Sequence, residues 1–365
     1  MSTTAYARGK QLTRVAAGLV AFALASSVLA TPFRNPLRAP HHAPGMGAPP
    51  QALQVVVLAL DGVRYQDVFA PSAAELMPRL YELMHQQGAA LGAPGVGFAI
   101  SATGPDFVSL PGYSEMLTGS SASGCENNGC SGTHALSVAD ELAQPSRGGW
   151  HTAIVSSWPD IARVAAKSQR VAVSSGRHGG ATRDWFSRSA GARAALTLAE
   201  SVAPWPGHGD FRRDRFTAEL ALSYLRERAP SFLFVSLGEP DEFAHQGNHA
   251  GYLDALRHAD QCIGELQAWL DQRAQQGVKT ALFITTDHGR ADNFRDHGHA
   301  HPESARVWLA AYGSAIGARG LVRAPSPRQL ADIAPTVRQL FGLTAEPASA
   351  PAGAVLSELL FAAKN

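Results

Sequence analysis

The chain of 365 residues contains only three cysteines, and none of them precedes Cys125. A lipid-modified cysteine near the N-terminus is therefore excluded, and without a C-x-x-C motif a zinc site made of cysteine thiolates is not expected. Cys125 and Cys130 flank a Glu-Asn-Asn-Gly turn and could form a disulfide in an oxidising compartment. Cys262 lies in a predicted helix, where a buried free thiol is the expected state.

Excess charge of one sign is also lacking. The formal net charge is +1, and the basic residues are dispersed along the chain. Nucleic-acid-binding proteins instead gather lysine and arginine on one face. The sequence thus has no nucleic-acid-binding signature.

A long apolar run is missing as well. The run at 15–30 has sixteen residues, fewer than the roughly 20 that span a membrane comfortably. Arg8, Lys10 and Arg14 precede it and Ser-Val-Leu-Ala ends it, which is typical of a secretory signal peptide at residues 1–30. An uncleaved anchor is the alternative. We expect an exported protein of a bacterial periplasm, with no stable membrane span after processing.

The composition changes twice after this run. Residues 31–52 are rich in proline and alanine and predict a flexible linker. Residues 53–365 are long enough for one large α/β domain. Within that domain, residues 148–210 are rich in glycine, serine, arginine and tryptophan, and we interpret them as a possible substrate lobe. Four of its side chains could contact a leaving group: Trp158, Arg177, His178 and Trp185.

Short apolar runs alternate with helical patterns over the domain. The runs that predict strands lie at 54–60, 231–237, 280–286 and 305–311. The patterns that predict helices lie at 72–87, 216–228, 252–272 and 332–340. This alternation predicts a largely parallel central sheet with helices on both faces.

Polar side chains follow three of the predicted strands. In an open α/β sheet such residues meet in one crevice at the carboxyl ends of the strands. With two loop residues added, seven side chains from five segments can be assembled into a two-metal site: Asp61, Ser109, Asp241, His245, Asp287, His288 and His297.

Aspartate and histidine together favour zinc, or less selectively manganese. The spacing Asp241-x-x-x-His245 lets one short segment present both side chains to the same ion. Asp287 and His288 are adjacent at a strand end, where neighbouring side chains point in opposite directions. We therefore expect one of them to reach each of two neighbouring divalent ions.

Ser109 precedes Pro111, and proline favours the first turn of a helix. Ser109 would thus lie at a helix N-terminus, which suits a phosphate group. Its hydroxyl becomes a good nucleophile only on losing its proton, which metal coordination promotes. Taken singly, a serine before proline is usually a helix cap; it is the joint pattern that predicts a catalytic site.

Five stretches carry a resemblance to a known family: LDG at 60–62, SLPGYSEMLTG at 109–119, EPDEFAH ending at His245, TTDHG ending at Gly289, and DIAPTVRQLFGL at 332–343. The chain resembles the alkaline phosphatase superfamily, which includes nucleotide pyrophosphatases/phosphodiesterases, arylsulfatases and cofactor-independent phosphoglycerate mutases. More narrowly, it looks like a branch of secreted bacterial phosphatase-like proteins. An alkaline phosphatase-like fold over residues 53–365 is what this resemblance implies.

The resemblance also implies a distribution of metal ligands. One ion would be held by Asp241, His245 and His297, and the other by Asp61, Asp287 and His288, with Ser109 between them. His299 is the alternative to His297.

Some positions depart from the family patterns. Tyr113 stands where sulfatases carry arginine, and the nucleophile position is serine, so a sulfatase is not favoured. Asn127 or Asn128 could take the place of the oxyanion-stabilising asparagine of the diesterases, or could simply form the turn. Arg64 could reach a phosphate, or could be a structural arginine.

The sequence therefore predicts an exported two-metal phosphoryl ester hydrolase. Its nucleophile would be Ser109, its intermediate a phosphoserine, and its substrate a small-molecule phosphate ester, with a phosphomonoesterase as the first expectation. A phosphodiesterase or nucleotide pyrophosphatase is the main alternative. A sulfatase, a phosphotransferase and a non-catalytic binding protein are weaker ones.

Overall fold

The computed structural model describes residues 52–178, 180–343 and 352–361. The predicted signal peptide and all but the last residue of the predicted linker lie outside these residues. In the described part of the chain, no helix has both the length and the apolar character needed to span a membrane.

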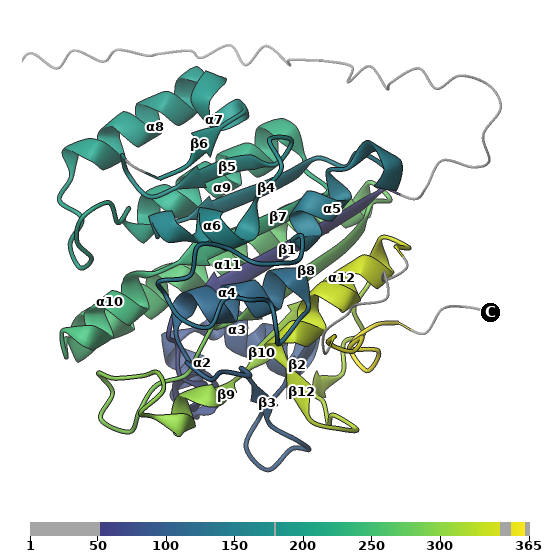
Figure 1. Cartoon of the computed structure of the whole chain (residues 1–365). Helices are drawn as coiled ribbons and strands as arrows, with labels where there is room; N and C mark the ends of the chain where they lie inside the picture. The colour runs from purple at the N-terminus through teal and green to yellow at the C-terminus, as the bar shows by residue number, and fades with distance from the viewer. Residues whose placement is uncertain (1–51, 179, 344–351, 362–365) are drawn as a thin grey trace, which may run out of the picture. The chain divides into compact units, whose positions relative to one another are not determined.

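A nine-stranded sheet forms the centre of the domain (Figure 1). Its strand order is β11-β2-β10-β8-β1-β7-β4-β5-β6. The five strands from β8 to β5 are parallel, whereas β10 and β6 join them antiparallel. The bounds are β1 Leu53–Leu60, β2 Ala89–Leu91, β4 Thr152–Ser156, β5 Ala172–Ser175, β6 Thr182–Arg183, β7 Phe232–Leu237, β8 Lys279–Thr285, β10 Leu309–Tyr312 and β11 Gly320–Leu321. The predicted fold class is confirmed.

Helices cover both faces of this sheet because β1 is buried along its whole length and alternate side chains enter two separate cores. The core on one face includes side chains of α4 Ser109–Thr118, α5 Val138–Leu142, α6 Ala162–Ala165 and α12 Ile333–Leu340. The other core includes side chains of α1 Tyr65–Phe69, α2 Ala73–Leu76, α3 Pro78–Glu82, α7 Trp185–Arg188, α8 Ala190–Ser201, α9 Asp214–Arg228, α10 Glu239–His245 and α11 His249–Gln275.

Two predicted elements are interrupted in the structure. The helix expected at 72–87 is broken into α2, α3 and a π-helical turn, η1 Leu83–Gln87. Pro78 begins α3, and a residue before proline is disfavoured in the helical region, so Met77 ends the first piece. The strand expected at 305–311 divides into β9 Arg306–Val307 and β10.

The division at Trp308 separates two sheets. Strand β9 belongs to a three-stranded sheet with β3 Ile100–Ser101 and β12 Arg328–Gln329, whereas β10 belongs to the central sheet. Trp308 is fully buried between them, and its indole N–H donates to the carbonyl of Val63 at 2.9 Å. The described residues also form short 3-10 turns: η2 Pro145–Arg147, η3 Pro159–Ile161, η4 Pro302–Ala305 and η5 Leu330–Asp332.

Residues 148–210, interpreted from sequence as a possible lobe, contribute β4, β5 and β6 to the central sheet. Cys125 and Cys130 form a disulfide. Cys262 is a buried free thiol, as expected.

Candidate metal centre

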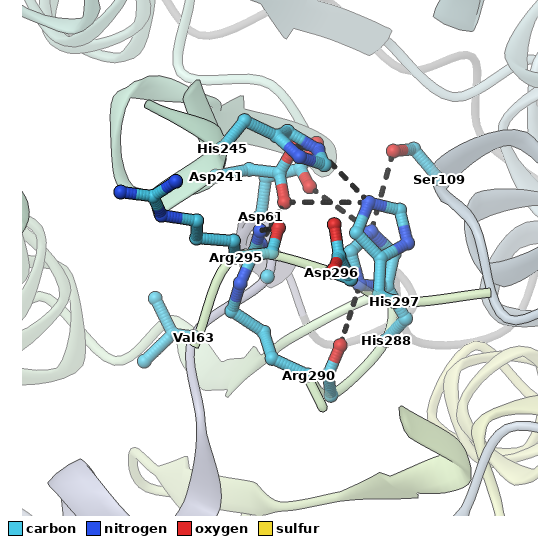
Figure 2. Close-up of polar contacts among 12 residues, drawn as sticks. Asp61, Val63, Ser109, Asp241, His245, His288, Arg290, Arg295, Asp296 and His297 are labelled. Atoms are coloured by element: carbon cyan, nitrogen blue, oxygen red, sulfur yellow. Dashed lines mark hydrogen bonds and ion pairs between the residues drawn. The ribbon is translucent and has the colours of Figure 1, made fainter. Parts of the chain in front are cut away.

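Three neighbouring strands deliver most of the predicted site residues to one edge of the sheet. In the order β8-β1-β7, each strand ends within four residues of a predicted metal ligand. Asp61 directly follows β1, and its backbone N–H continues the pairing by donating to the carbonyl of Leu237 at 2.9 Å. Helix α10, which begins two residues after β7, carries Asp241 and His245. The convergence expected at the strand ends is therefore present (Figure 2).

The first group of potential ligands is Asp61, Asp287 and His288, whose ligand atoms all lie within 4.8 Å of one another. His288 Nε2 is 3.4 Å from Asp61 Oδ1 and 3.6 Å from Asp287 Oδ2. His288 Nδ1 lies 2.8 Å from the Gly289 carbonyl, so Nδ1 donates there and Nε2 faces the carboxylates.

Two carboxylate oxygens in this group are buried and make no hydrogen bond within the described structure: Asp61 Oδ1 and Asp287 Oδ2. A buried carboxylate oxygen without a hydrogen bond is costly. A divalent cation bound by both would remove that cost, so the donor set fits a metal.

The second group is Asp241, His245 and His297, also within 4.8 Å of one another. The i, i+4 spacing on α10 puts Asp241 and His245 on one face, with His245 Nε2 3.0 Å from Asp241 Oδ2. His297 Nδ1 lies 2.9 Å from the Phe107 carbonyl and donates to it, which leaves Nε2 as an acceptor 3.0 Å from His245 Nε2. Imidazole nitrogens and a carboxylate converging in this way again fit a divalent cation.

His299 lies elsewhere. It is exposed, its backbone N–H donates to Asp106, and its Nδ1 is 3.3 Å from the Pro105 carbonyl. The two groups thus coincide with the two ligand sets that the family resemblance implies, with His297 rather than His299.

Strand alternation predicted that Asp287 and His288 would reach different ions, but in this geometry both side chains belong to the first group. Strand β8 ends at Thr285, so strand alternation no longer applies two residues later. Thr286 Oγ1 donates to the His288 carbonyl, and the Asp287 carboxylate accepts from the His288 N–H at 3.0 Å. This tight turn brings both side chains to Asp61.

Ser109 is the first residue of α4, as predicted, and its Oγ lies 3.5 Å from His288 Nε2. In Figure 2 its hydroxyl is directed towards the histidines of both groups. Gly112 allows this approach, because a Cβ there would lie 2.2 Å from the Asp287 carbonyl oxygen. The close packing of α4 on the end of β8 therefore sets the position of Ser109.

Charges within the site shift several pKa values. Burial and the neighbouring Asp61 raise the pKa of Asp287 well above its usual range. Burial lowers the pKa of His288, but the charges of Asp287, Asp61 and Asp241 outweigh it and raise that pKa to about 9. Burial alone would raise the pKa of Asp241, yet the Arg290 guanidinium holds it well below its usual range. Protons held at the first group would be released on metal binding.

Two supporting residues were not recognised as such from sequence. The Tyr113 hydroxyl, one helical turn after Ser109, donates to Asp61 Oδ2 at 2.7 Å and lies 2.7 Å from Ser236 Oγ. Arg290, directly after TTDHG, is buried and donates to Asp241, while its other nitrogens donate to the carbonyls of Phe294 and Arg295. Two sequence features could have identified them: Tyr113 lies four residues after Ser109, and Arg290 directly follows the TTDHG motif.

The predicted substrate residues have different surroundings. Asn128 Oδ1 accepts from the Leu110 N–H at 2.9 Å, at the start of α4. Asn127 instead accepts from Gly129 within its own turn. Arg64 pairs with Asp67 at 2.8 Å, and its guanidinium stacks on Phe294. Of the three, Asn128 alone lines the cavity beside Ser109.

That cavity has a volume of about 280 Å³ and opens beside Ser109, Asp61 and the second metal-ligand group. Residues beyond the predicted metal ligands and Ser109 complete its lining: Asn128, Trp158, His208, Phe211, Gly238 and Glu242. Burial and the charges of Asp241 and Asp61 raise the pKa of Glu242 to about 7. Of the four side chains proposed to meet a leaving group, Trp158 lines the cavity, whereas Arg177, His178 and Trp185 do not.

Residues 213–345 match a family model described as the Metalloenzyme superfamily. A 2,3-bisphosphoglycerate-independent phosphoglycerate mutase from Gracilaria tenuistipitata var. liui is 30% identical over 129 residues, which is 34% of this chain. The aligned segment spans only 24% of that mutase.

Solved structures extend the likeness to most of the described domain. Alkaline phosphatase PafA superposes with a TM-score of 0.56 at 11% identity, covering 86% of this chain and all of that one. A 2-O GAG sulfatase superposes with a TM-score of 0.57 at 11% identity, covering 84% and 74%. At these identities the likeness establishes the fold.

Proposed function

We propose that this chain, a member of the alkaline phosphatase superfamily by its sequence matches and its fold, is a metal-dependent phosphoryl ester hydrolase with Ser109 as nucleophile. One observation carries the proposal. A serine hydroxyl at a helix N-terminus lies beside two groups of carboxylates and imidazoles that each fit a divalent cation. Loss of any one of these parts would leave the site incomplete.

Two divalent ions, zinc or manganese from the donor set, would be held by Asp61, Asp287 and His288 and by Asp241, His245 and His297. Bound there, such ions lower the pKa of a nearby hydroxyl and offset the charge of a phosphate. The chain itself supplies the orientation: Tyr113 fixes Asp61, Arg290 fixes Asp241, and the Nδ1 bonds of His288 and His297 fix their tautomers.

Ser109 Oγ would attack phosphorus, forming the Ser–O–P bond while the bond from phosphorus to the leaving oxygen breaks. The leaving oxygen gains a proton, and water then hydrolyses the phosphoserine, releasing phosphate and restoring the hydroxyl. The Asn128 amide is placed to assist. Asn128 lines the cavity and its oxygen accepts from the Leu110 N–H, so its NH₂ group would be the donor for a phosphate oxygen.

A phosphate monoester is the first candidate substrate, because two divalent ions can offset its two charges. A phosphodiester is the second, and one observation favours it. Of the described residues that line the cavity, none is lysine or arginine. A diester carries one negative charge and therefore needs less compensation than a monoester.

Export to a periplasm is also a proposal. It is supported by the basic and apolar pattern at residues 1–30 and by the Cys125–Cys130 disulfide, which suits an oxidising compartment.

The test is an assay of purified protein combined with elemental analysis. Release of p-nitrophenol would be compared for the phosphate monoester, the bis-phosphodiester and the sulfate, with and without zinc or manganese. We expect about two metal ions per chain and metal-dependent turnover of a phosphate ester. Protein that binds no divalent metal, or that cleaves only the sulfate, would overturn the proposal.

A further inference from the structure

We propose that the cavity beside Ser109 binds a cationic leaving group, so that the substrate is a phosphate ester of an amino alcohol. This inference rests on the proposed function, because it names the substrate of the same site. It depends on three lining residues that belong to neither metal-ligand group: two aromatic residues, Trp158 and Phe211, and one acidic residue, Glu242. We call these three residues the leaving-group wall.

Glu242 is the acidic residue of the leaving-group wall. Glu242 belongs to neither metal-ligand group, and no lysine or arginine occurs among the described lining residues. Among the described residues Glu242 forms an ion pair with the His208 ring, whose Nδ1 lies 3.7 Å from it and whose side chain is 89% exposed. A surface ion pair of this kind is weak and is screened by salt. Glu242 is therefore available to a cation in the cavity.

The aromatic part of the wall is held in place. Phe211 is 3% exposed, and its ring packs against two glycines: a Cβ at Gly207 or Gly238 would come within 2.4 or 2.8 Å of ring carbons. The Trp158 backbone is fixed by Ser156, whose Oγ accepts from its N–H and donates to its carbonyl, both at 3.0 Å. The Phe211 ring and the Trp158 backbone are thus held in place before any ligand binds, which reduces the entropy cost of binding.

Aromatic faces attract ammonium groups through the ring quadrupole, most strongly where water is displaced. A carboxylate beside two aromatic side chains adds a direct charge interaction. A sugar or a nucleobase could stack on the same rings, but it has no cationic group to pair with the Glu242 carboxylate. A leaving group with a second phosphate or a carboxylate would be repelled by the Glu242 carboxylate. Among small leaving groups, an amino alcohol therefore matches the wall best.

The reaction is balanced without any additional reactant. Ser109 Oγ forms a bond to phosphorus, the bond from phosphorus to the amino alcohol oxygen breaks, and that oxygen takes a proton. Water then cleaves the phosphoserine. The amino alcohol could arrive as a free phosphate monoester, as a glycerophosphodiester or as a phospholipid headgroup, and these sources are separated by experiment.

The central test compares two esters of the same shape. Phosphocholine carries a quaternary ammonium, whereas 3,3-dimethylbutyl phosphate has carbon in place of nitrogen and is uncharged at that end. We expect kcat/KM for phosphocholine to be higher by roughly tenfold or more. Glu242→Gln, which keeps size and removes charge, should bring the ratio close to one. Trp158→Leu should lower it as well, and the matched exposed variant Glu75→Gln should leave it unchanged.

Three further arms identify the source of the amino alcohol and separate the two proposals. Glycerophosphocholine and phosphatidylcholine vesicles test the diester and the lipid headgroup. p-Nitrophenyl phosphate and its diester test the chemistry without an ammonium group. If the nitrophenyl esters are hydrolysed but kcat/KM is the same for phosphocholine and 3,3-dimethylbutyl phosphate, the cationic subsite is overturned and the hydrolase proposal stands.

Calorimetric titration with tetramethylammonium chloride tests the wall independently of turnover. Binding that is lost in Glu242→Gln and in Trp158→Leu is the expected result. Absence of binding to the wild-type protein, or binding that is equal in all variants, would overturn the inference even if every ester proved inert.

Discussion

Asp214 and Glu239 form a reciprocal pair of hydrogen bonds, in which the side-chain carboxylate of each accepts from the backbone N–H of the other. The Asp214 carboxylate accepts from the Glu239 N–H at 2.9 Å, and the Glu239 carboxylate accepts from the Asp214 N–H at 3.2 Å. Asp214 also accepts from the Gly238 N–H at 2.8 Å, so it satisfies the N–H groups at the start of α10. Because α10 carries Asp241 and His245, this pair connects the start of α9 to the second metal-ligand group.

Replacing Asp214 by asparagine should weaken that connection. One of the N–H groups would face an amide NH₂ instead of an acceptor, which costs about 1–3 kcal/mol in unfolding free energy when buried. The shift of α10 should also weaken zinc binding at Asp241, His245 and His297 more than at the other group. Chemical denaturation measures the first effect, and zinc titration against a chelator measures the second.

Asp254→Asn on α11 is the matched control, because Asp254 is exposed and, among the described residues, its ion pair is with Arg257 one turn away. It should leave both measurements unchanged. If Asp214→Asn lowered the two zinc affinities equally, or neither of them, the positioning role of Asp214 would be contradicted.

Tyr113→Phe should reduce metal affinity at the first group. The substitution removes the hydroxyl that donates to Asp61 Oδ2 and leaves that oxygen unpaired, while the ring and its packing remain. Loss of a hydrogen bond to a metal ligand typically lowers affinity by about 10–100-fold. Competition with a zinc chelator would report this as the weakening of one ion while the other is retained.

Tyr81→Phe serves as the control for that experiment, since the Tyr81 ring packs on His85 and no hydrogen bond of its hydroxyl is found in the described structure. Equal zinc affinities in Tyr113→Phe and wild type would show that Asp61 needs no support from this hydroxyl.

Ser109→Ala should abolish turnover and keep both metal ions. The hydroxyl is the proposed nucleophile, whereas the six carboxylates and imidazoles of the two groups remain intact. A drop in kcat of at least about a thousandfold is expected for loss of a nucleophile. Ser72→Ala, at an exposed position with no side-chain cap bond, is the control. Undiminished turnover by Ser109→Ala would refute the assignment.

The segments of the candidate site could be predicted because they combine two local signals. Buried strands such as β1 and β8 have continuous apolar sequences, and their carboxyl ends meet in a parallel sheet. The directions of Asp287 and His288 could not be obtained in this way, because they depend on where β8 ends and on the turn at Thr286. The local sequence pattern thus predicts where these ligands lie in the fold, but not the directions of their side chains.

The residues that line the cavity could not be predicted from the sequence, for a different reason. Phe211 and Glu242 are 31 positions apart in the sequence and line the same cavity, where the Phe211 ring packs against Gly238 at the start of α10. Neither belongs to a periodic pattern that would mark it. The break of the helix at Pro78, in contrast, follows from proline itself and could have been anticipated from the sequence.

Stability should depend on pH through Glu115, which lies on α4 with Ser109 and accepts from the Thr103 N–H at 2.9 Å. Burial raises its pKa from 4.5 to about 7. Because the folded pKa exceeds the unfolded one, folding favours the protonated carboxyl. The contribution of Glu115 to the unfolding free energy is fully present below about pH 4.5 and is lost as the pH rises to about 7.

Glu115→Gln keeps a neutral side chain at every pH and should remove this dependence. At pH 8 the variant should therefore exceed wild type by up to about 3 kcal/mol in unfolding free energy, while near pH 4.5 the two should agree. Urea denaturation of both proteins from pH 4.5 to 8 measures the difference directly, and the exposed Glu75→Gln should follow wild type throughout. If the difference in unfolding free energy between Glu115→Gln and wild type stayed constant with pH, the Glu115 carboxyl would titrate as it does in the unfolded chain. The hydrogen bonds from Thr103 would then be strong enough to offset the cost of burying its charge.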